Sequence, residues 1–319
     1  MQRWGKTSTG KQRYRCRQCN STGINQRPDS RLRMFQKMFV RWLTTSDHLE
    51  TIAQRNQVSV RTLKNHFCNF WKHLPRPLLP NGNSRILVVD GVGVIKHVLV
   101  ALIAQNPDTH TPISWSFAER ECYESWRSFF LTLQCNGVNP KFVVCDGQRG
   151  LLKALIEVWP SVLIQRCLIH VVRQAKLWLT QHPRTKAGQE LRGIVCALLK
   201  VRTRRQKRRW IRSFRSWMKR HQLLLKEHTI NPNNPKRWWY THRKLRATRS
   251  LINNSIPDLF RFISDCTVPR TSNHVEGGIN SRLKDLLRIH RGLKSRHQQV
   301  LVAWYLATRQ GQKPTRNFH

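Results

Sequence analysis

Runs of apolar residues bounded by turn signals predict a sheet in the middle of the chain. A proline-rich linker over 74–84 leads into three such runs, at 85–90, 94–104 and 112–118. The first two runs are separated by Gly-Val-Gly, which is typical of a hairpin turn. A helical pattern follows at 122–133. The core is therefore predicted to begin with three antiparallel strands and a helix.

The pattern then alternates between strands and helices. The runs at 141–146 and 162–166 predict strands, and residues 150–159 between them predict a helix. A further helix follows the second of these strands. Three strands, helix, strand, helix, strand and helix is the order of a ribonuclease H-like fold. We therefore expect an α/β domain with a mixed sheet.

Helical periodicity dominates the remaining C-terminal half. Residues 175–265 combine this periodicity with many Arg, Lys and Trp residues and show no convincing strand pattern, which predicts an all-helical insertion. Two more helices are predicted over 272–289 and 297–308. The domain that holds the sheet is thus expected in two parts, 85–174 and 266–319.

The segment before the linker, 31–73, has the pattern of a helix-turn-helix. Its two short helices each place apolar residues on one face, at Leu49, Ile52 and Ala53 and at Val60, Leu63 and Phe67. Gln57 and Val58 form the turn, and Ser59 can cap the second helix. The outward face of that helix carries side chains suited to DNA phosphates and base edges, namely Arg61, Thr62, Lys64 and Asn65. An ordinary helical hairpin is the alternative.

The N-terminal residues 1–30 have one organised feature, a Cys-x-x-Cys pair. Cys16 and Cys19 end the strand-like stretch QRYRCRQC, as in one knuckle of a zinc ribbon. A structural zinc takes about four ligands, and this segment has no His and no other Cys. Three interpretations remain open: a true start upstream of Met1, a decayed ribbon, or two free cysteines in a basic tail.

The charge of the chain identifies the class of its partner. The 319 residues include 58 Lys and Arg against 16 Asp and Glu, a formal net charge of +42. The excess is spread along the whole chain, where it repels itself unless a polyanion neutralises it. Nucleic acid is the expected partner, and a function without a polyanion is disfavoured.

The cysteine content and the hydropathy of the chain indicate the cellular compartment of the protein. Nine cysteines at irregular spacing do not make a disulfide framework, and no apolar run near the N-terminus marks a signal peptide. The longest apolar stretch, 98–104, is far shorter than the about 20 residues of a membrane helix. We expect a cytoplasmic protein without a membrane partner.

Acidic residues are scarce, so a carboxylate just beyond a buried strand is conspicuous. Asp90 and Asp146 both hold such positions, and inner neighbouring strands would bring them side by side. Two such carboxylates repel each other unless a cation joins them. Oxygen ligands suit Mg²⁺ or Mn²⁺, and two such ions support phosphodiester cleavage. Glu276, in a predicted later helix, is the best-placed third acid.

Two segments around these acids resemble the Mutator-type transposases of bacterial insertion sequences. One, DGQRGLLKALIEVWPSVLIQRCLIHVVRQ, opens with Asp146 and closes with Cys167 and His170. The other, RTSNHVEGGINSRLKDLLRIHRGLK, surrounds Glu276. The resemblance implies a ribonuclease H-like fold with a helical insertion before the Glu. It also implies an Asp-Asp-Glu (DDE) metal triad, in which Asp90 matches by position more than by motif.

The resemblance implies a substrate and an assembly as well. Such enzymes cleave at the terminal inverted repeats of their element and join the freed 3′-hydroxyl ends to target DNA. Double-stranded DNA is then the substrate, two Mg²⁺ or Mn²⁺ ions are the cofactor, and zinc is uncertain. The chain is expected to act as a homo-oligomer on DNA, associated with the bacterial nucleoid.

Further residues are expected to support the acids or DNA. Cys167 and His170 match the Cys-x-x-His signature of the family and can orient the second Asp or touch DNA, with simple packing as the alternative. Asn273 can cap the helix of the third acid, and Arg282 can reach a phosphate or lie on a solvated face. Four tryptophans lie amid arginines and suit either base stacking or a core: Trp210, Trp217, Trp238 and Trp239.

Three rival functions fit the same residues. A non-catalytic, sequence-specific DNA-binding protein would use the helix-turn-helix and the charge alone. A ribonuclease H-like nuclease or resolvase would cut strands without joining them. An inactive transposase remnant is the third, since the zinc ribbon is only half present. Metal-dependent nicking and strand joining distinguish them.

Overall fold

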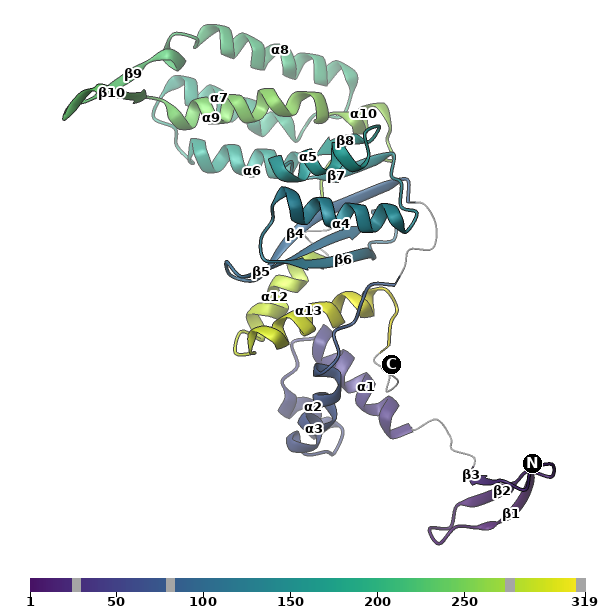
Figure 1. The fold of residues 1–319 in the computed structure, drawn as a ribbon. Helices are drawn as coiled ribbons and strands as arrows, with labels where there is room; N and C mark the ends of the chain where they lie inside the picture. The colour runs from purple at the N-terminus through teal and green to yellow at the C-terminus, as the bar shows by residue number, and fades with distance from the viewer. Residues whose placement is uncertain (25–29, 79–83, 273–278, 314–319) are drawn as a thin grey trace. The chain divides into compact units, whose positions relative to one another are not determined.

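In the computed structural model the chain forms two compact units, one built mainly from Met1–Leu74 and the other from Pro75–Gly311. The structure describes residues 1–24, 30–78, 84–272 and 279–313. Figure 1 shows the course of the chain. Each unit has its own buried core.

The chain begins with a small antiparallel sheet in the order β1-β2-β3. Its strands are β1 (Gln2–Lys6), β2 (Gln12–Arg15) and β3 (Thr22–Ile24). Cys16 and Cys19 lie in the turn between β2 and β3, and both are free thiols. This arrangement agrees with the predicted strand-like stretch before the cysteines, but it adds no further ligand pair for zinc.

Three helices follow: α1 (Ser30–Thr44), α2 (Leu49–Arg55) and α3 (Val60–Trp71). Large aromatic side chains from α1 and α3 fill the space between the helices, namely Phe35, Phe39, Trp42, Phe67 and Phe70. Ser59 caps α3 as predicted, because its hydroxyl accepts a hydrogen bond from the Thr62 backbone N–H at 3.0 Å. The two predicted helices are therefore present, and α1 contributes much of their core.

The larger unit is built on a five-stranded sheet in the order β6-β5-β4-β7-β8. β4 (Ile86–Ile95), β5 (Leu99–Gln105) and β6 (Pro112–Ala118) are antiparallel neighbours. β7 (Phe142–Cys145) pairs in parallel with β4, and β8 (Leu163–Arg166) pairs in parallel with β7. The predicted α/β class with a mixed sheet is confirmed.

The first hairpin turns later than the sequence predicts. Residues 91–93 were expected to form the turn, but they continue β4, and the turn follows Ile95, where His97 has a φ of 60°. Glycine marks a close approach of another group as well as a turn, and a Cβ on Gly91 would overlap a neighbouring carboxyl group. Asp90 therefore lies within a strand, paired with Ile103, instead of at a strand end.

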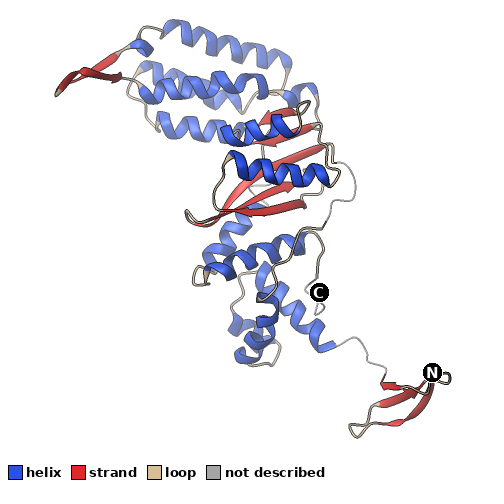
Figure 2. Ribbon diagram, viewed as in Figure 1, coloured by secondary structure: helices blue, strands red, loops and turns tan. Residues whose placement is uncertain are grey.

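Helices cover both faces of the sheet (Figures 1 and 2). α4 (Tyr123–Cys135) and α5 (Arg149–Val158) pack on one face, against Leu87 and Val89 of β4. α6 (Leu168–Leu179) and the insertion pack on the other face. Successive strand residues point to opposite faces, so nearly every position of β4 before Asp90 is buried.

The insertion consists mainly of α7 (Lys186–Leu198), α8 (Arg204–Arg220) and α9 (Arg243–Ser255). Short helical turns complete it, namely η1 (Leu224–Lys226), η2 (Ile256–Asp258) and α10 (Arg261–Ser264). Apolar faces of these helices form one core with α6 and the sheet.

The prediction of an all-helical insertion is wrong in one place. β9 (His228–Asn231) and β10 (Asn234–Tyr240) form an antiparallel hairpin, which Figure 2 shows in red at the far end of the insertion. Nearly all its residues are at least partly exposed, so no alternation of buried and exposed positions marks the strands. A pattern of hydrophobicity could not reveal it.

Two helices close the larger unit, α12 (Ser281–Ile289) and α13 (Ser295–Arg309). Both contact β4. The helix predicted over 272–289 is confirmed only from Ser281, since Ser272 itself lies in a bend and 273–278 are outside the described residues. Within the described ranges, no helix has the length and apolar character that a membrane crossing requires.

Gln165 of β8 attaches the end of the insertion to the sheet. Its side chain is fully buried, donates to the Leu259 carbonyl at 3.0 Å and accepts from the Arg261 backbone N–H at 2.9 Å. These bonds satisfy two buried backbone groups where the chain leaves α9 and returns toward the sheet. The insertion is thereby held at both of its ends, by α6 and by Gln165.

We expect Gln165→Leu to lower the free energy of unfolding of this unit by about 2–4 kcal/mol. Each buried backbone group that loses its partner costs about 1–3 kcal/mol. Urea denaturation followed by circular dichroism measures the change. Gln181→Leu, at an exposed position, is the matched control. An equal effect of the two substitutions would contradict the assigned role of Gln165.

Candidate active site

The register of β4 and β7 places two predicted site residues at the same level of the sheet. Val88 pairs with Val144 in the parallel ladder. Two residues further along are Asp90 and Asp146. Neighbouring strands lie about 4.8 Å apart, so both carboxylates belong to one small region although Asp90 lies inside its strand.

Asp90 is held by a residue that the sequence analysis did not identify. Its Oδ2 accepts a hydrogen bond from Asn280 Nδ2 at 2.6 Å, and its Oδ1 accepts from the Gly91 backbone N–H at 2.9 Å. Asn280 is only 2% exposed and immediately precedes α12. Its position in a predicted amphipathic helix, four residues after Glu276, was the available signal. It anchors the C-terminal helices to β4 beside the first Asp.

Asp146 is held in a tight turn at the end of β7. Its Oδ1 accepts from the Gln148 backbone N–H at 2.9 Å, and its carbonyl accepts from Arg166 Nε at 3.1 Å. Gly147 has a φ of 83°, where a side chain is strained, and a Cβ there would also overlap Arg166. The turn therefore needs glycine at 147, both for its backbone and for the buried Arg166.

Cys167 and His170 lie at the start of α6, close to this turn. Cys167 is fully buried, and its sulfur accepts hydrogen bonds from the backbone N–H and the hydroxyl of Ser272, at 3.3 and 3.2 Å. Burial alone would raise the pKa of Cys167, but hydrogen bonds from His170 and Ser272 lower it below its ordinary value. Cys167 thus fastens Ser272 to the start of α6.

Glu121, between β6 and α4, is a further acid that the sequence analysis missed. Burial, followed by the negative charges of Asp146 and Asp90, raises the pKa of Glu121 to about 7, and His170 opposes part of this rise. The Glu121 carboxyl group lies where a Cβ on Gly91 would be, and Gln148 Nε2 donates to the Glu121 carbonyl at 2.8 Å. The structure thus places Asp90, Asp146 and Glu121 in one region of the sheet, and His170 interacts electrostatically with Glu121.

Some predicted residues lie elsewhere or outside the described residues. Glu276 and Asn273 fall within 273–278, which the structure does not describe. Arg282 is exposed on α12. Their roles remain predictions.

The predicted DNA-reading face of α3 is largely available. Arg61, Lys64 and Asn65 are exposed. Thr62 is partly buried, and its hydroxyl shares a hydrogen bond of 2.9 Å with Ser59, so it serves the helix cap. Three of the four residues are therefore free of such a local structural role.

The four tryptophans of the insertion divide into two groups. Trp210 and Trp217 are buried on α8 and belong to the core. Trp238 on the β9–β10 hairpin is 55% exposed, and Trp239 lies beneath the guanidinium of Arg243. Base stacking remains a possible role only for the tryptophans of the hairpin.

The metal ions that the family resemblance implies can be tested against the donor atoms present. Asp90, Asp146 and Glu121 offer hard carboxylate oxygens, which suit Mg²⁺ or Mn²⁺. Among the described residues no group of three His, Cys, Asp or Glu side chains already surrounds one point. Mg²⁺ usually keeps several waters and binds one or two carboxylates, so the donor set fits such ions.

The cysteine pair of the N-terminal sheet does not complete a zinc site by itself. Hydrogen bonds from Ser21 lower the pKa of Cys19 to about 7, which favours the thiolate that metals bind. A structural zinc takes about four ligands, and the described residues near Cys16 and Cys19 supply no others. The two thiols fit one half of such a site.

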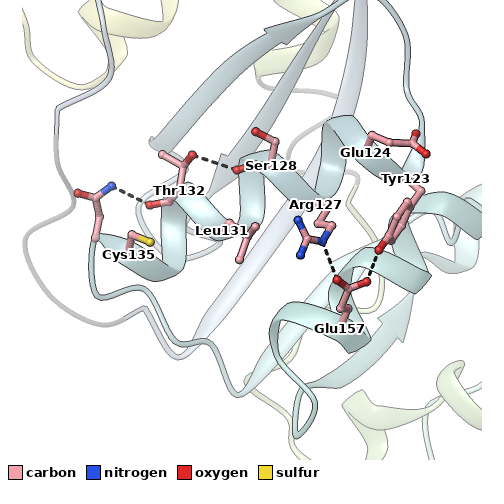
Figure 3. A pocket seen from close by; sticks show the side chains of 9 residues that line it. Tyr123, Glu124, Arg127, Ser128, Leu131, Thr132, Cys135 and Glu157 are labelled. Atoms are coloured by element: carbon pink, nitrogen blue, oxygen red, sulfur yellow. Dashed lines mark hydrogen bonds and ion pairs between the residues drawn. The ribbon is translucent and has the colours of Figure 1, made fainter.

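A pocket of about 740 Å³ on the outer side of α4 holds none of the predicted site residues (Figure 3). Its notable feature is Glu157 of α5, which binds both the Tyr123 hydroxyl and Arg127 Nε, the latter at 2.6 Å. These contacts fix α4 to α5. Glu121 lies shortly before α4 and Asp146 shortly before α5, so the contacts also help to hold the segments that carry the two acids.

Comparisons with known proteins point to one family of transposases. The family described as "Transposase, Mutator family" matches residues 83–229, which include Asp90, Asp146, Cys167 and His170. A probable insertion-sequence transposase of Corynebacterium diphtheriae is 29% identical over 116 residues, or 35% of this chain and 34% of the relative. The transposase of element ISRM5 of Rhizobium meliloti (strain 1021) is 32% identical over 103 residues, or 32% of this chain and 26% of the relative.

These matches confirm the resemblance to Mutator-type insertion-sequence transposases. The matched stretch spans about a third of one relative and about a quarter of the other. The family match ends at residue 229 and so does not reach Glu276.

The raised pKa of Glu121 predicts how stability depends on pH without metal. In the folded state the Glu121 carboxyl group stays protonated up to about pH 7, whereas the ordinary pKa of this group is 4.5. The raised pKa therefore contributes stability to the folded state that is fully present below about pH 4.5. This stability is lost as the pH rises through about 7. In chelator, wild-type protein should lose thermal stability relative to Glu121→Gln between about pH 5 and 8.

Melting curves of both proteins across this range measure the effect, with Glu119→Gln as the control at an exposed neighbouring position. Wild type and Glu119→Gln should change in parallel. A constant difference between wild type and Glu121→Gln at all pH values would show that Glu121 does not titrate in this window.

Proposed function

We propose that this chain, whose resemblance to the Mutator transposase family is confirmed over residues 83–229, is an insertion-sequence transposase that cuts DNA and joins the cut strands. Asp90, Asp146 and Glu276 are its Asp-Asp-Glu triad, on a ribonuclease H-like domain. Its substrates are the terminal inverted repeats of its element and a target duplex. Its cofactor is a pair of Mg²⁺ or Mn²⁺ ions.

The observation that carries this proposal is the register of β4 and β7. On this register, Asp90 and Asp146 belong to one level of the sheet, and the strand residues that precede each of them are all buried. Carboxylates so close together repel each other in the absence of a cation. A fold that places them there is explained by a cation-dependent reaction better than by packing.

Two anchors support Glu276 as the third acid. Ser272 is bonded to Cys167, and Asn280 is bonded to Asp90. Glu276 is four residues from each anchor in the sequence, which supports its assignment as the third acid.

The surrounding residues orient the two Asp carboxylates before DNA arrives. Asn280 fixes one oxygen of Asp90, and the Gln148 backbone fixes one oxygen of Asp146. A carboxylate has about four lone-pair sites, so a hydrogen bond that orients it does not prevent it from binding a cation. When bound, the two cations would activate the attacking oxygen and stabilise the leaving oxygen of the phosphodiester. Water is the first nucleophile, and the freed 3′-hydroxyl is the second.

The basic surface supports the assignment of DNA as substrate. α8 buries Trp210, Phe214 and Trp217 on one side. Its other side exposes a row of basic side chains at helical spacing, namely Arg208, Arg212, Arg215 and Lys219. Such a row suits phosphate contacts, which supply affinity without sequence preference. Sequence preference for the inverted repeats is assigned to α3, and the active species to a homo-oligomer on DNA.

Replacement of the triad should separate catalysis from binding. Asp90→Asn, Asp146→Asn and Glu276→Gln should each reduce nicking and strand joining at least about a hundredfold, because a metal site supplies several kcal/mol of transition-state stabilisation. Duplex affinity should stay nearly unchanged, since the basic residues provide it. Gel assays on a pre-cut end in Mg²⁺ or Mn²⁺ measure both reactions.

Asp108→Asn, at an exposed position in the turn before β6, should retain full activity, and excess chelator should abolish the activity of wild type. Full cleavage in chelator would overturn the metal mechanism. Cleavage without joining would assign the chain to the nucleases, and metal-independent binding without any cleavage would assign it to the non-catalytic DNA-binding proteins.

The face of α3 should determine sequence preference. Arg61→Ala and Asn65→Ala should each lower the preference for the specific duplex over random DNA by about 1–3 kcal/mol, the size of one base contact. Lys219→Ala on α8 should weaken binding to the specific and the random duplex equally. Competition binding at fixed salt concentration measures the ratio. An equal loss on both duplexes would make Arg61 and Asn65 phosphate contacts.

A further inference from the structure

A fourth carboxylate lies beside the two Asp residues that the proposed function uses. Glu121 follows β6 and immediately precedes Cys122, the N-cap residue of α4. β6 is the edge strand on the side of the sheet away from β7. Gln148, which follows β7, nevertheless donates to the Glu121 carbonyl, so the segment after β6 passes across β5 and β4 toward the turn after β7.

The carboxyl group of Glu121 occupies the space beside Gly91. A Cβ built on Gly91 would overlap both Oε1 and Cδ of Glu121. Gly91 directly follows Asp90 in β4, and its backbone N–H binds the Asp90 carboxylate. The absence of a side chain at 91 therefore lets the Glu121 carboxyl group reach the backbone of β4 at the residue after the first Asp, from the face opposite the Asp90 side chain.

A second contact joins Glu121 to the turn that holds Asp146. Gln148 Nε2 donates to the Glu121 carbonyl at 2.8 Å, while the Gln148 backbone N–H donates to Asp146 Oδ1 at 2.9 Å. One residue thus binds both acids. The Gln148 Oε1 is buried and has no hydrogen-bond partner within the part of the chain that the structure describes.

Close packing of two helix starts keeps this arrangement in place. A Cβ on Gly150, in the first turn of α5, would lie 2.7 Å from the Tyr123 backbone nitrogen. Further along the same helices, Glu157 binds Tyr123 and Arg127. Glu121 is therefore positioned by the backbone of rigid elements on both sides.

Packing alone does not account for an acid at this position. Glu121 is partly buried, and this burial, followed by the charges of Asp146 and Asp90, raises its pKa. Among the described residues its carboxylate has no ion pair or hydrogen bond. A neutral side chain of the same shape would be more stable there in the absence of a cation.

We propose that Glu121 supplies a carboxylate to the divalent cations that Asp90 and Asp146 hold. The inference rests on the proposed function, because it assigns a further acid to the same metal site. A ligand from this position would approach the ions from the β6–α4 side.

Manganese binding tests this proposal without any measurement of activity. The full chain is titrated with Mn²⁺ in the absence of DNA, and free Mn²⁺ is followed by electron paramagnetic resonance. Glu121→Gln should lower the Mn²⁺ affinity at least about tenfold, since even residues that only support metal ligands contribute 10–100-fold. Glu119→Gln, two residues away and exposed, should bind like wild type.

Two further variants make the outcomes distinguishable. Asp90→Asn should lose Mn²⁺ affinity if the proposed function is right, whatever the role of Glu121. Wild-type affinity in Glu121→Gln together with a loss in Asp90→Asn would overturn only the present inference. Failure of wild type to bind Mn²⁺ would overturn both proposals.

Glu121→Asp keeps the charge and shortens the side chain. It should bind Mn²⁺ more weakly than wild type but more tightly than Glu121→Gln, which a purely structural role does not predict. Melting curves in chelator separate this effect from misfolding, because Glu121→Gln should be no less stable than wild type at about pH 8. An affinity of Glu121→Asp equal to that of Glu121→Gln would also count against a ligand role.

Discussion

The parallel pairing of β4 with β7 is the constraint on which the rest of the molecule depends. It sets Asp90 and Asp146 side by side, and the repulsion between carboxylates must be resisted by the structure around them. Backbone hydrogen bonds of the ladder and two buried helical layers supply that resistance. Hydrogen bonds then orient the two Asp residues, from Asn280 to Asp90 and from Gln148 and Arg166 to Asp146.

Three glycines allow the elements that carry the acids to pack closely. Gly91, Gly147 and Gly150 each stand where a Cβ would meet another group, respectively Glu121, Arg166 and the Tyr123 backbone. All three positions are within or next to the elements that carry the acids. The glycines therefore determine how closely β4, β7 and the start of α4 approach one another.

The sequence predicted the parts of this site that local patterns encode. The strands β4 to β8 were foreseen because their apolar runs are uninterrupted, and Asp90 and Asp146 were conspicuous as acids beside such runs. Ser59 was foreseen as a cap because capping depends on neighbouring residues. The turn at 91–93 was misjudged, because a glycine that admits a distant side chain has the same local appearance as a glycine that permits a turn.

Residues whose role depends on distant partners could not be predicted. Glu121 meets Gln148 across 27 positions, Cys167 meets Ser272 across 105, and Asp90 meets Asn280 across 190. No periodicity reports such contacts. The β9–β10 hairpin was missed for a different reason, since its exposed strands show no buried face.

The 190-residue separation of Asp90 and Asn280 has a consequence during synthesis. At about 5–20 residues per second, a ribosome needs on the order of 10–40 s to add the residues between them. Throughout that time the nascent chain already carries α1 to α3 but lacks the anchor of its first Asp. Under the proposed function, an interrupted translation product would bind DNA without cutting it, so prematurely terminated copies would act as competitive inhibitors of the intact protein.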